Sequence, residues 1–434
     1  MFSTAYKRYV LSMMTLVLTL NFVDRGLVGL LLQPIKEELH LSDTQLGLLT
    51  GITFGLFYAT LGLPVARWAD RGNRVTIASI AIGLWGVTVM SCLFVTNFGQ
   101  LLAARIAAAV GESGCMPSTY SLVGDYFPAP AERTRAIAIY WLGNPLNTLL
   151  SFVVGGWLSQ RYGWRETFFL MGVPGLLVAI VVKLTVAEPR LKGGAPTLVT
   201  KPPRVAEVLG ALWGRRSARH LIGGIVALFT LGLGLGPWYG AFLMRSHGMG
   251  PAELGVWLGL IFGLGGSAGT WLGGYVASRW LADNEEAQMR VCAATVIALI
   301  PGYAIFLLVP EKRYALMALV PCSIVFVFSL GPAFALLQRL VADEMRATTL
   351  AVVMLLANLI GMGVGPEVVG LLSDVFSPRL GSDSLRYAML ALFPVAVWSA
   401  YHFLRAGKTV REDLSAAAGV GSTSSIGPCC GETA

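Results

Sequence analysis

Apolar residues dominate the chain in twelve long stretches that polar segments separate. Each stretch holds at least about eighteen residues, the length that a helix needs to cross the hydrocarbon core of a membrane. The pattern predicts an all-α, polytopic membrane protein with transmembrane helices near 9–32, 43–68, 75–95, 98–122, 135–158, 165–187, 218–244, 250–278, 289–310, 314–340, 347–372 and 386–404.

One polar segment, Glu188 to Arg219, is much longer than the others and divides the spans into two sets of six. Within it, apolar residues at helical spacing predict a short amphipathic helix on the membrane face: Val205, Val208, Leu209, Leu212 and Trp213. The predicted organisation is a six-helix bundle at 1–187, a cytoplasmic loop containing this helix at 188–217, a second six-helix bundle at 218–405 and a disordered cytoplasmic tail at 406–434.

The two halves repeat part of their pattern. The matches, at a nearly constant offset, are Arg135-Ala136 with Arg346-Ala347, Asn144 with Asn358, and Val153-Val154-Gly155 with Val368-Val369-Gly370. Two six-helix halves repeated in parallel and joined by a long cytoplasmic loop resemble the major facilitator superfamily. The resemblance implies a central site that opens alternately to the two sides of the membrane as the halves rock.

Composition supports the membrane assignment. Hydrophobic residues make up 55% of the chain and charged residues only 13%, against about 25% charged in ordinary soluble domains. The 32 Lys and Arg residues exceed the 24 Asp and Glu residues, but they flank the apolar stretches and form no recognition element, so no nucleic-acid partner is expected. Most of them lie at the termini and in the even-numbered connections, which predicts that both termini are cytoplasmic.

The sequence lacks signs of catalytic or metal-binding chemistry. Four of the six cysteines fall singly within apolar stretches, and no C-x-x-C spacing occurs. The four histidines form no H-x-x-x-H pair or catalytic dyad, and no Gly-rich loop ends in Lys-Ser/Thr. We therefore expect no metal, no cofactor and no enzymatic activity, and a membrane-embedded enzyme is the most distant alternative.

Four ionisable residues lie inside two of the apolar stretches. The sequence Asn21-Phe22-Val23-Asp24-Arg25-Gly26 sets an acid beside a base in the first stretch, and the fourth stretch carries Arg105 and Glu112. Charges at such depth cost about 2.5–3.5 kcal/mol each on insertion scales, so they usually face a bundle interior or a water-filled path. Asp24 and Arg105 are equally far from the outer ends of their stretches. We therefore expect Asp24 to pair with Arg105. Its chain neighbour Arg25 is not the expected partner, because neighbours on a helix point about 100° apart.

These charges predict a proton-coupling site. An Arg105 that faces a cavity between Asp24 and Glu112 would partner either acid and leave the other free to take a proton. Movement of the arginine would then switch the proton affinity of the carboxyl groups. Asp24 is the first candidate for the proton site and Glu112 the second, while Arg25 and Arg105 are candidates for the charge network and the substrate head-group. The alternative is a static, permanently ionised network that joins the two spans.

Two loops on the predicted cytoplasmic side carry charged motifs. Ala66-Arg67-Trp68-Ala69-Asp70-Arg71-Gly72-Asn73-Arg74 resembles the superfamily's signature loop, G-x-x-x-D-R-x-G-R, in which the Asp would face the positive N-terminal end of the eleventh span. Ala187-Glu188-Pro189-Arg190 resembles the superfamily's P-E-S-P-R motif. We predict a cytoplasmic gate, meaning charge contacts that hold the protein closed on that side, from Asp70, Arg71, Arg74, Glu188 and Arg190. Positive-inside anchoring would explain the arginines but not Asp70.

The second half offers mainly aromatic and polar residues where the first half has charges. A cavity that is charged on one wall and apolar on the other suits an amphiphile, with its anionic head at Arg25 or Arg105. The alternatives are packing or a helix–helix hydrogen bond for most candidates, and a local cap for the one acid. The predicted cavity residues are Asn144, Asn147, Trp238, Tyr239, Phe334, Gln338, Asn358 and Glu367.

The motifs together resemble the bacterial branch of the Spinster family. The shared features are N-F-V-D-R-G in the first span, the D-R-x-N-R form of the signature loop, R-x-x-x-x-x-G-E-S in the fourth span, Gly331-Pro332, Asn358 and Gly365-Pro366. The resemblance implies a proton-coupled secondary transporter of the bacterial inner membrane, with eukaryotic relatives that carry lysophospholipids or sphingosine-1-phosphate. It places the family's proton-binding Asp on Asp24, its span-four Arg on Arg105 and its Glu on Glu112.

The substrate and the direction of transport stay open at this point. The expected partners are a proton, a small amphiphilic organic anion and membrane lipid, and the protein is expected to be a monomer. A carrier for small carboxylates or drugs is the alternative within the same fold. The departures from the family's pattern are Ser113, at a position after the Glu where alanine is common, and the glycines at 232, 234 and 236, so the resemblance does not define the substrate.

Overall fold

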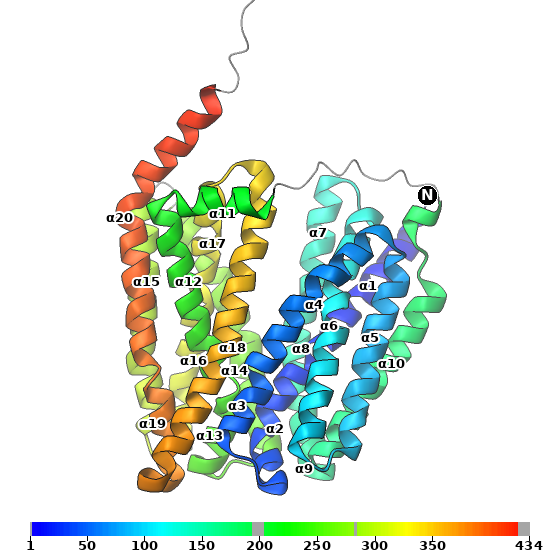
Figure 1. Cartoon of the computed structure of the whole chain (residues 1–434), viewed down its shortest axis with the longest axis vertical. Coiled ribbons are helices and arrows are strands. Elements are labelled where there is room, and N and C mark those ends of the chain that lie inside the picture. Colours follow the sequence, from blue (N-terminus) through cyan, green and yellow to red (C-terminus); the bar gives the residue numbers. More distant parts are fainter. Residues whose placement is uncertain (1, 193–203, 282–283, 424–434) are drawn as a thin grey trace, which may run out of the picture.

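The described residues of the computed structural model are 2–192, 204–281 and 284–423. They form helices and connecting turns, arranged as two bundles side by side (Figure 1). Each of the twelve predicted spans corresponds to one helix or to a few consecutive helices. The all-α fold predicted from the apolar pattern is therefore confirmed.

The first bundle holds α1 to α10. Its six spans are, in order, α1 (Thr4–Asn21) with α2 (Val23–Leu39); α3 (Asp43–Thr50) with α4 (Ile52–Arg71); α5 (Arg74–Ser91), followed by the short η1 (Cys92–Phe94); α6 (Phe98–Tyr126); α7 (Pro130–Trp141), α8 (Gly143–Leu149), the π-helical turn η2 (Leu150–Val154) and α9 (Gly155–Tyr162); and α10 (Trp164–Thr185), followed by η3 (Pro189–Lys192).

The second bundle holds α12 to α20. Its six spans are, in order, α12 (Arg216–Leu235) with α13 (Trp238–His247); α14 (Pro251–Arg279); α15 (Glu285–Leu308); α16 (Lys312–Phe328) with α17 (Leu330–Arg339); η4 (Asp343–Met345) with α18 (Arg346–Leu380); and η5 (Gly381–Asp383), α19 (Ser384–Leu390) and α20 (Phe393–Thr423).

The segment between the bundles contains α11 (Val205–Trp213), where the amphipathic helix is predicted. It lies across the ends of the second bundle (Figure 1), packed against α12 and α18. Val208 and Leu212 are fully buried, whereas Val205 and Trp213 are more than half exposed. One apolar edge of α11 thus packs on the bundle and another is left uncovered.

The prediction of a disordered tail from residue 406 is wrong as far as Thr423. Helix α20 continues without a break to that residue, and Figure 1 shows its last turns extending beyond the bundle. The segment includes Ala416-Ala417-Ala418, and alanine has the strongest helix propensity. The rest of the predicted tail, 424–434, lies outside the described residues.

Nine helical segments of the described chain are long and apolar enough to cross a membrane. The last of them, Asp343–Ser415, covers the final two predicted spans. The predicted spans 43–68 and 98–122 are helical as α3–α4 and α6 but are not among the nine. Gly51 interrupts the first of these helices, and the second carries Arg105 and Glu112.

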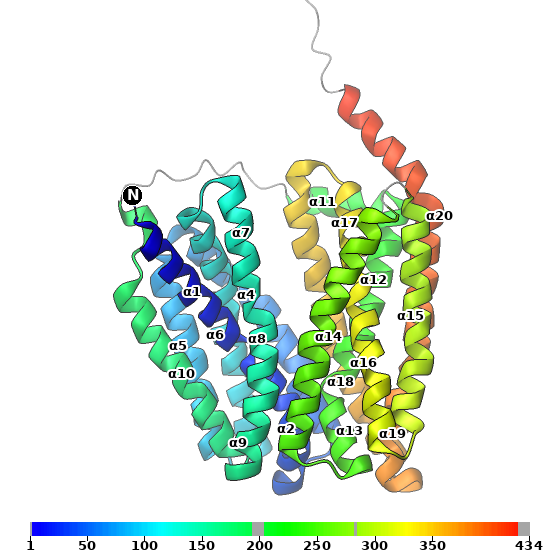
Figure 2. The ribbon, with the colours of Figure 1, turned by 180° about the vertical axis from the view of Figure 1, so that it is seen from behind.

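The two bundles contact each other at the face opposite the N-terminus and α11. There α2 packs against α13, α3 against α18 and α9 against α14. Both views show the bundles diverging toward the other face, which we call the terminal face (Figures 1 and 2). Glycines permit the close approach, since a Cβ built on Gly47 would lie 2.8 Å from the Cα of Glu367. The bundles therefore touch backbone to backbone at this contact.

Replacing Gly47 by valine should separate α3 from α18, because the added carbons would meet backbone atoms of Pro366 and Glu367. Overpacking of this kind costs about 1–3 kcal/mol, so we expect a lower Tm for the purified protein. The control is Gly274→Val, at an exposed glycine of α14 whose Cβ would meet no atom within 4 Å. Equal losses of Tm in the two variants would contradict a tight contact at Gly47.

Candidate functional site

The first span is broken beside its buried acid. Helix α1 ends at Asn21, Phe22 leaves the helical conformation with φ −111° and ψ 2°, and α2 begins at Val23. Asp24 therefore lies in the first turn of α2, where the helix dipole favours a negative charge. Ser151 of η2 donates its Oγ hydrogen to the carbonyl of Val23 at 3.0 Å. The break is thus joined to the fifth span next to Asp24.

Asp24 is fully buried, and two side chains donate hydrogen bonds to it. Its Oδ2 forms an ion pair with Nη1 of Arg105, and its Oδ1 accepts a hydrogen bond from Nε1 of Trp85 at 2.9 Å. The structure therefore brings Asp24 and Arg105 together, as the depth of the two residues predicts. Trp85 does not stand out in the sequence, because a tryptophan in an apolar stretch resembles an ordinary packing residue.

Arg25 turns away from its neighbour Asp24 and pairs with Glu112. Its Nε donates to Oε2 of Glu112 at 2.8 Å, and its Nη2 lies 2.6 Å from the same oxygen. Glu112 is fully buried, and the Arg25 side chain is about one quarter exposed. The Arg25 guanidinium also lies 4.6–4.8 Å from the ring centres of Phe22, Phe54 and Tyr58. These rings add cation–π attraction on the faces that no acid covers.

The predicted sharing of Arg105 between two acids is wrong in this conformation. Each acid has its own arginine, Asp24 with Arg105 and Glu112 with Arg25. The prediction included Arg25 in the charge network but did not assign it to Glu112, because depth alone does not show that its long side chain reaches from α2 to α6. The ring of Phe54 lies 4.6 Å from the Arg25 guanidinium and 4.8 Å from that of Arg105, so it separates the two cations.

A cavity of about 1190 Å³ lies between the bundles, and both arginines line it. They are the only charged residues in its lining among the residues that the structure describes. The first bundle also contributes Thr50, Asn144 and Thr148. Further lining residues come from α12, α13, α14, α15, α16 and α18 of the second bundle. The cavity is therefore cationic on one wall.

Aromatic residues form much of the opposite wall. The ring of Tyr239 is stacked between those of Phe262 and Tyr303, at centroid distances of 5.5 Å and 6.2 Å. The Tyr239 hydroxyl donates to the Tyr303 hydroxyl at 2.9 Å. Phe326 and Trp271 are the other aromatic residues of this wall, and the first bundle adds Phe54, Trp141 and Phe152 to the lining. This wall offers apolar surface with few polar atoms.

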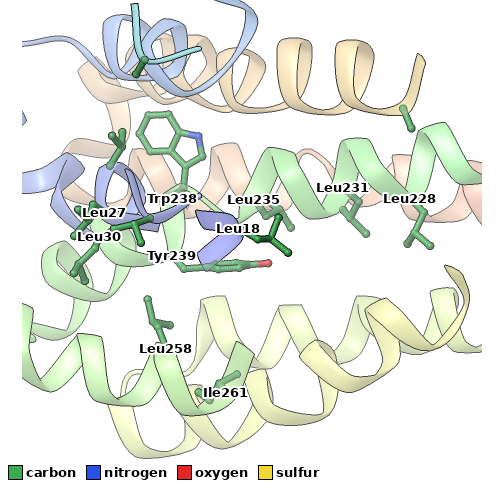
Figure 3. Close-up of a cluster of buried hydrophobic side chains, with 14 of the residues drawn as sticks. Leu18, Leu27, Leu30, Leu228, Leu231, Leu235, Trp238, Tyr239, Leu258 and Ile261 are labelled. Carbon is green, nitrogen blue, oxygen red and sulfur yellow. The ribbon is translucent and has the colours of Figure 1, made fainter. Parts of the chain in front are cut away.

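Three of the predicted cavity residues line the cavity: Asn144, Tyr239 and Asn358. The other five do not. Trp238 donates its indole hydrogen to the Pro366 carbonyl at 3.1 Å, and Figure 3 shows it pointing away from its neighbour Tyr239. The side-chain amide of Asn147 lies 3.0 Å from Oγ of Ser151.

The remaining three predicted cavity residues are used elsewhere. Phe334 packs edge to face on Phe229, the backbone carbonyl of Gln338 accepts from Arg346, and the backbone of Glu367 packs on Gly47. Sequence position alone does not reveal which way a helical side chain points, as Trp238 shows.

The predicted gate residues that the structure describes lie within the first bundle. Fully buried Arg74 bonds Glu188 at 2.5 Å and Asp125 at 2.7 Å, and Arg190 lies 3.9 Å from Asp125. These pairs join α5, α6 and the segment after α10, so they do not connect the bundles here. The side chains of Asp70 and Arg71 lie outside the described ones, and their gate role stays a prediction. Figure 1 shows α4 and α18 diverging toward the terminal face.

A second charge cluster, which the sequence reasoning missed, connects the bundles at the opposite face. Arg245 of α13 bonds both carboxylate oxygens of Asp43 at 2.7 Å and 2.8 Å, and Lys36 adds a third contact at 2.6 Å. Asp374 of α18 accepts from the backbone amide of Thr44 at 2.8 Å. We call these four charged residues the far-face cluster. The sequence gives little indication of this cluster, since charged residues are common at the ends of membrane spans.

The Arg25–Glu112 pair gives a test of stability. Removing one partner of a buried ion pair leaves an uncompensated charge and costs about 3–5 kcal/mol. We expect Arg25→Met to lower the Tm strongly, and the double variant Arg25→Met/Glu112→Gln to recover much of that loss. Thermal unfolding of the purified variants measures both effects. Additive losses would show that the two side chains do not interact.

Comparison with known proteins identifies the family. Residues 14–366 match the model of the Major Facilitator Superfamily. The chain is 33% identical over 382 residues to an MFS-type efflux pump of Mycolicibacterium smegmatis, with 87% of each chain covered. It is 26% identical over 448 residues to protein spinster homolog 1 of Xenopus laevis, with 94% of this chain and 82% of the relative covered.

A solved structure gives the same result. It is the crystal structure of a bacterial homolog to the human lysosomal transporter Spinster, in an inward-facing and unoccupied conformation. The TM-score is 0.84 at 29% identity, with 95% of this chain and 99% of that chain covered. The chain therefore belongs to the Major Facilitator Superfamily, as a Spinster-like multi-pass membrane transporter.

Proposed function

We propose that the chain is a proton-coupled secondary transporter that carries an amphiphilic organic anion by alternating access. One observation carries this proposal. Within the described part of the chain, Arg25 and Arg105 are the only charged residues that line the cavity, and each is held by a buried carboxylate.

The chemistry of the two walls supports the substrate class. A guanidinium group matches the geometry of phosphate and carboxylate, which it can bind through two parallel hydrogen bonds. The aromatic wall across the cavity suits an apolar chain. The volume of about 1190 Å³ is larger than most drug-sized pockets, which hold about 300–1,000 Å³. A lysophospholipid or a sphingoid phosphate combines these properties.

Proton coupling rests on the carboxylates behind the arginines. A proton on Asp24 would cancel the charge that holds Arg105, and a proton on Glu112 would do the same for Arg25. Either event would leave an arginine free to hold an anion in the cavity. Asp24 is the first candidate, because Arg105 is nearly buried and its release would expose an uncompensated cation to the substrate.

Alternating access requires that the contacts at the far face break and that new ones form at the terminal face. The far-face cluster would open, and Asp70 would approach the N-terminal end of α18. We propose that the terminal face is cytoplasmic and that the membrane is the bacterial inner membrane. The similarity to a structure described as inward-facing supports this orientation. The protein would act as a monomer in contact with membrane lipid.

A second candidate is export of drugs or small carboxylates. The M. smegmatis relative, described as an efflux pump, favours export. The same two arginines would hold the anionic group of such a substrate, and the aromatic wall would hold its rings. The coupling mechanism would be unchanged.

Binding distinguishes these substrate classes. A ligand at about 100 times its Kd stabilises the folded state by about 2.7 kcal/mol, so we expect an oleoyl lysophosphatidate to raise the Tm of the purified protein by several degrees. The effect should be lost in Arg105→Gln. Oleoyl glycerol, which lacks the charge, controls for changes in the detergent micelle. A response to short hydrophilic acids and to no amphiphile would contradict the proposed substrate class.

Coupling is tested in proteoliposomes with an imposed pH gradient. We expect Asp24→Asn to reduce gradient-driven accumulation of labelled lysophosphatidate at least about tenfold, which is a change of about 1.4 kcal/mol in the driving free energy. Asp383→Asn, at a half-exposed carboxylate outside the cavity lining, is the matched control. Full gradient-driven accumulation in Asp24→Asn would remove Asp24 as the proton site.

A further inference from the structure

Trp85 is a fully buried residue of α5 that holds one oxygen of the proposed proton site. Its Nε1 donates to Oδ1 of Asp24 at 2.9 Å. An indole nitrogen is a donor only, so a buried indole that lacks an acceptor destabilises the folded state through its unsatisfied N–H group. Asp24 supplies that acceptor.

Two glycines fix the position of this indole. A Cβ built on Gly175 of α10 would lie 2.6 Å from Cζ3 of Trp85, and a Cβ on Gly111 of α6 would lie 2.8 Å from its backbone nitrogen. Any larger residue at these positions would displace α5 or the ring. Gly111 directly precedes Glu112, so the glycine of the G-E motif is the place where α6 approaches Trp85. The indole is therefore packed too tightly to follow a rotating carboxyl group.

The charged and titratable groups that face Asp24 come from every element around it. Arg105 and Glu112 belong to α6, Arg25 to α2 and Cys92 to the turn after α5. Tyr58 of α4 lies against Arg25. Arg105 pairs with Oδ2 of Asp24, and the carboxyl group of Glu112 lies within hydrogen-bond distance of the Asp24 carboxyl group. The two oxygens of Asp24 thus have different partners, a neutral donor on Oδ1 and a cation on Oδ2.

We infer that Trp85 is a positioning residue that directs the proton to Oδ2 of Asp24, the oxygen that Arg105 occupies. The inference rests on the proposed function, in which Asp24 takes the proton. A protonated carboxyl group keeps one carbonyl oxygen, which is the better acceptor, and one hydroxyl oxygen. Because Trp85 must donate to the carbonyl oxygen, Oδ1 stays unprotonated. The proton therefore adds to Oδ2.

This assignment makes proton binding and the Arg105 ion pair mutually exclusive. A hydroxyl on Oδ2 presents its hydrogen where Nη1 of Arg105 donates now, so the arginine has to leave. Without the Trp85 contact, the carboxyl group could turn and take the proton on the oxygen remote from Arg105. The released arginine already lines the cavity. Loading of the proton would then be linked directly to the appearance of a free cation for the anionic head-group.

Infrared difference spectroscopy of the reconstituted protein, titrated from alkaline to acid pH, tests the inference without any substrate. The C=O band of protonated Asp24 is the band that Asp24→Asn removes. In the wild type this carbonyl accepts a hydrogen bond from Trp85, which weakens the C=O bond. We expect Trp85→Phe to move the band to higher wavenumber, because the donor is lost while the aromatic ring remains.

Trp164→Phe is the matched control. The Trp164 indole also donates to a carboxylate, Oε2 of Glu38 at 2.6 Å. Loss of this donor in Trp164→Phe should leave the Asp24 band in place. If Trp85→Phe does not fold, benzothienylalanine at position 85 keeps the ring shape and lacks the N–H donor. A band that Trp85→Phe or this isostere leaves unmoved would overturn the role of Trp85 alone. Absence of any pH-dependent band that Asp24→Asn removes would overturn the proposed proton site together with the inference.

Discussion

The structure depends on how four charged side chains, those of Asp24, Arg25, Arg105 and Glu112, are accommodated inside an apolar bundle. A buried charge is tolerated when an opposite charge and further hydrogen bonds replace its water. Here two acids and two arginines form two separate pairs, and aromatic rings cover the guanidinium faces that no carboxylate reaches. The break at Phe22 serves the same end, because it starts a new helix whose positive end lies at Asp24. The contact of Ser151 with Val23 then ties this helix start to the fifth span.

The two bundles contribute different kinds of side chains to the cavity. Both supply aromatic surface, but among the described lining residues only the first supplies charge, so the repeated fold holds an asymmetric site. This asymmetry follows from sequence differences between related spans, since the second bundle carries no counterparts of Arg25 and Arg105 in the cavity lining that the structure describes. At the far face the bundles are instead alike, because both present glycines that let backbones approach.

The sequence was sufficient to predict the helices, their grouping into two sets of six and the pairing of Asp24 with Arg105. Those predictions need only hydrophobic length and depth along a helix, which the order of residues specifies. The pairing of Arg25 with Glu112 could not be predicted from the sequence, because a long side chain can reach around the helix to a different neighbour. Trp238 and Tyr239 show the same limit, since these adjacent aromatic residues point in different directions and only Tyr239 lines the cavity. Trp85 escaped notice because its one polar atom matters only when its acceptor is known.

The pairing of each arginine with its own carboxylate has an electrical consequence. When all four groups are ionised, their charges sum to zero, and the empty carrier can then change from one conformation to the other without moving charge through the electric field. A proton and a monovalent anion loaded together would preserve that balance, whereas a divalent head-group would not. The charge state of the cargo thus decides whether the membrane voltage does work on the loaded carrier, at about 2.3 kcal/mol per charge and 100 mV. Current recorded from a supported membrane would separate the two cases.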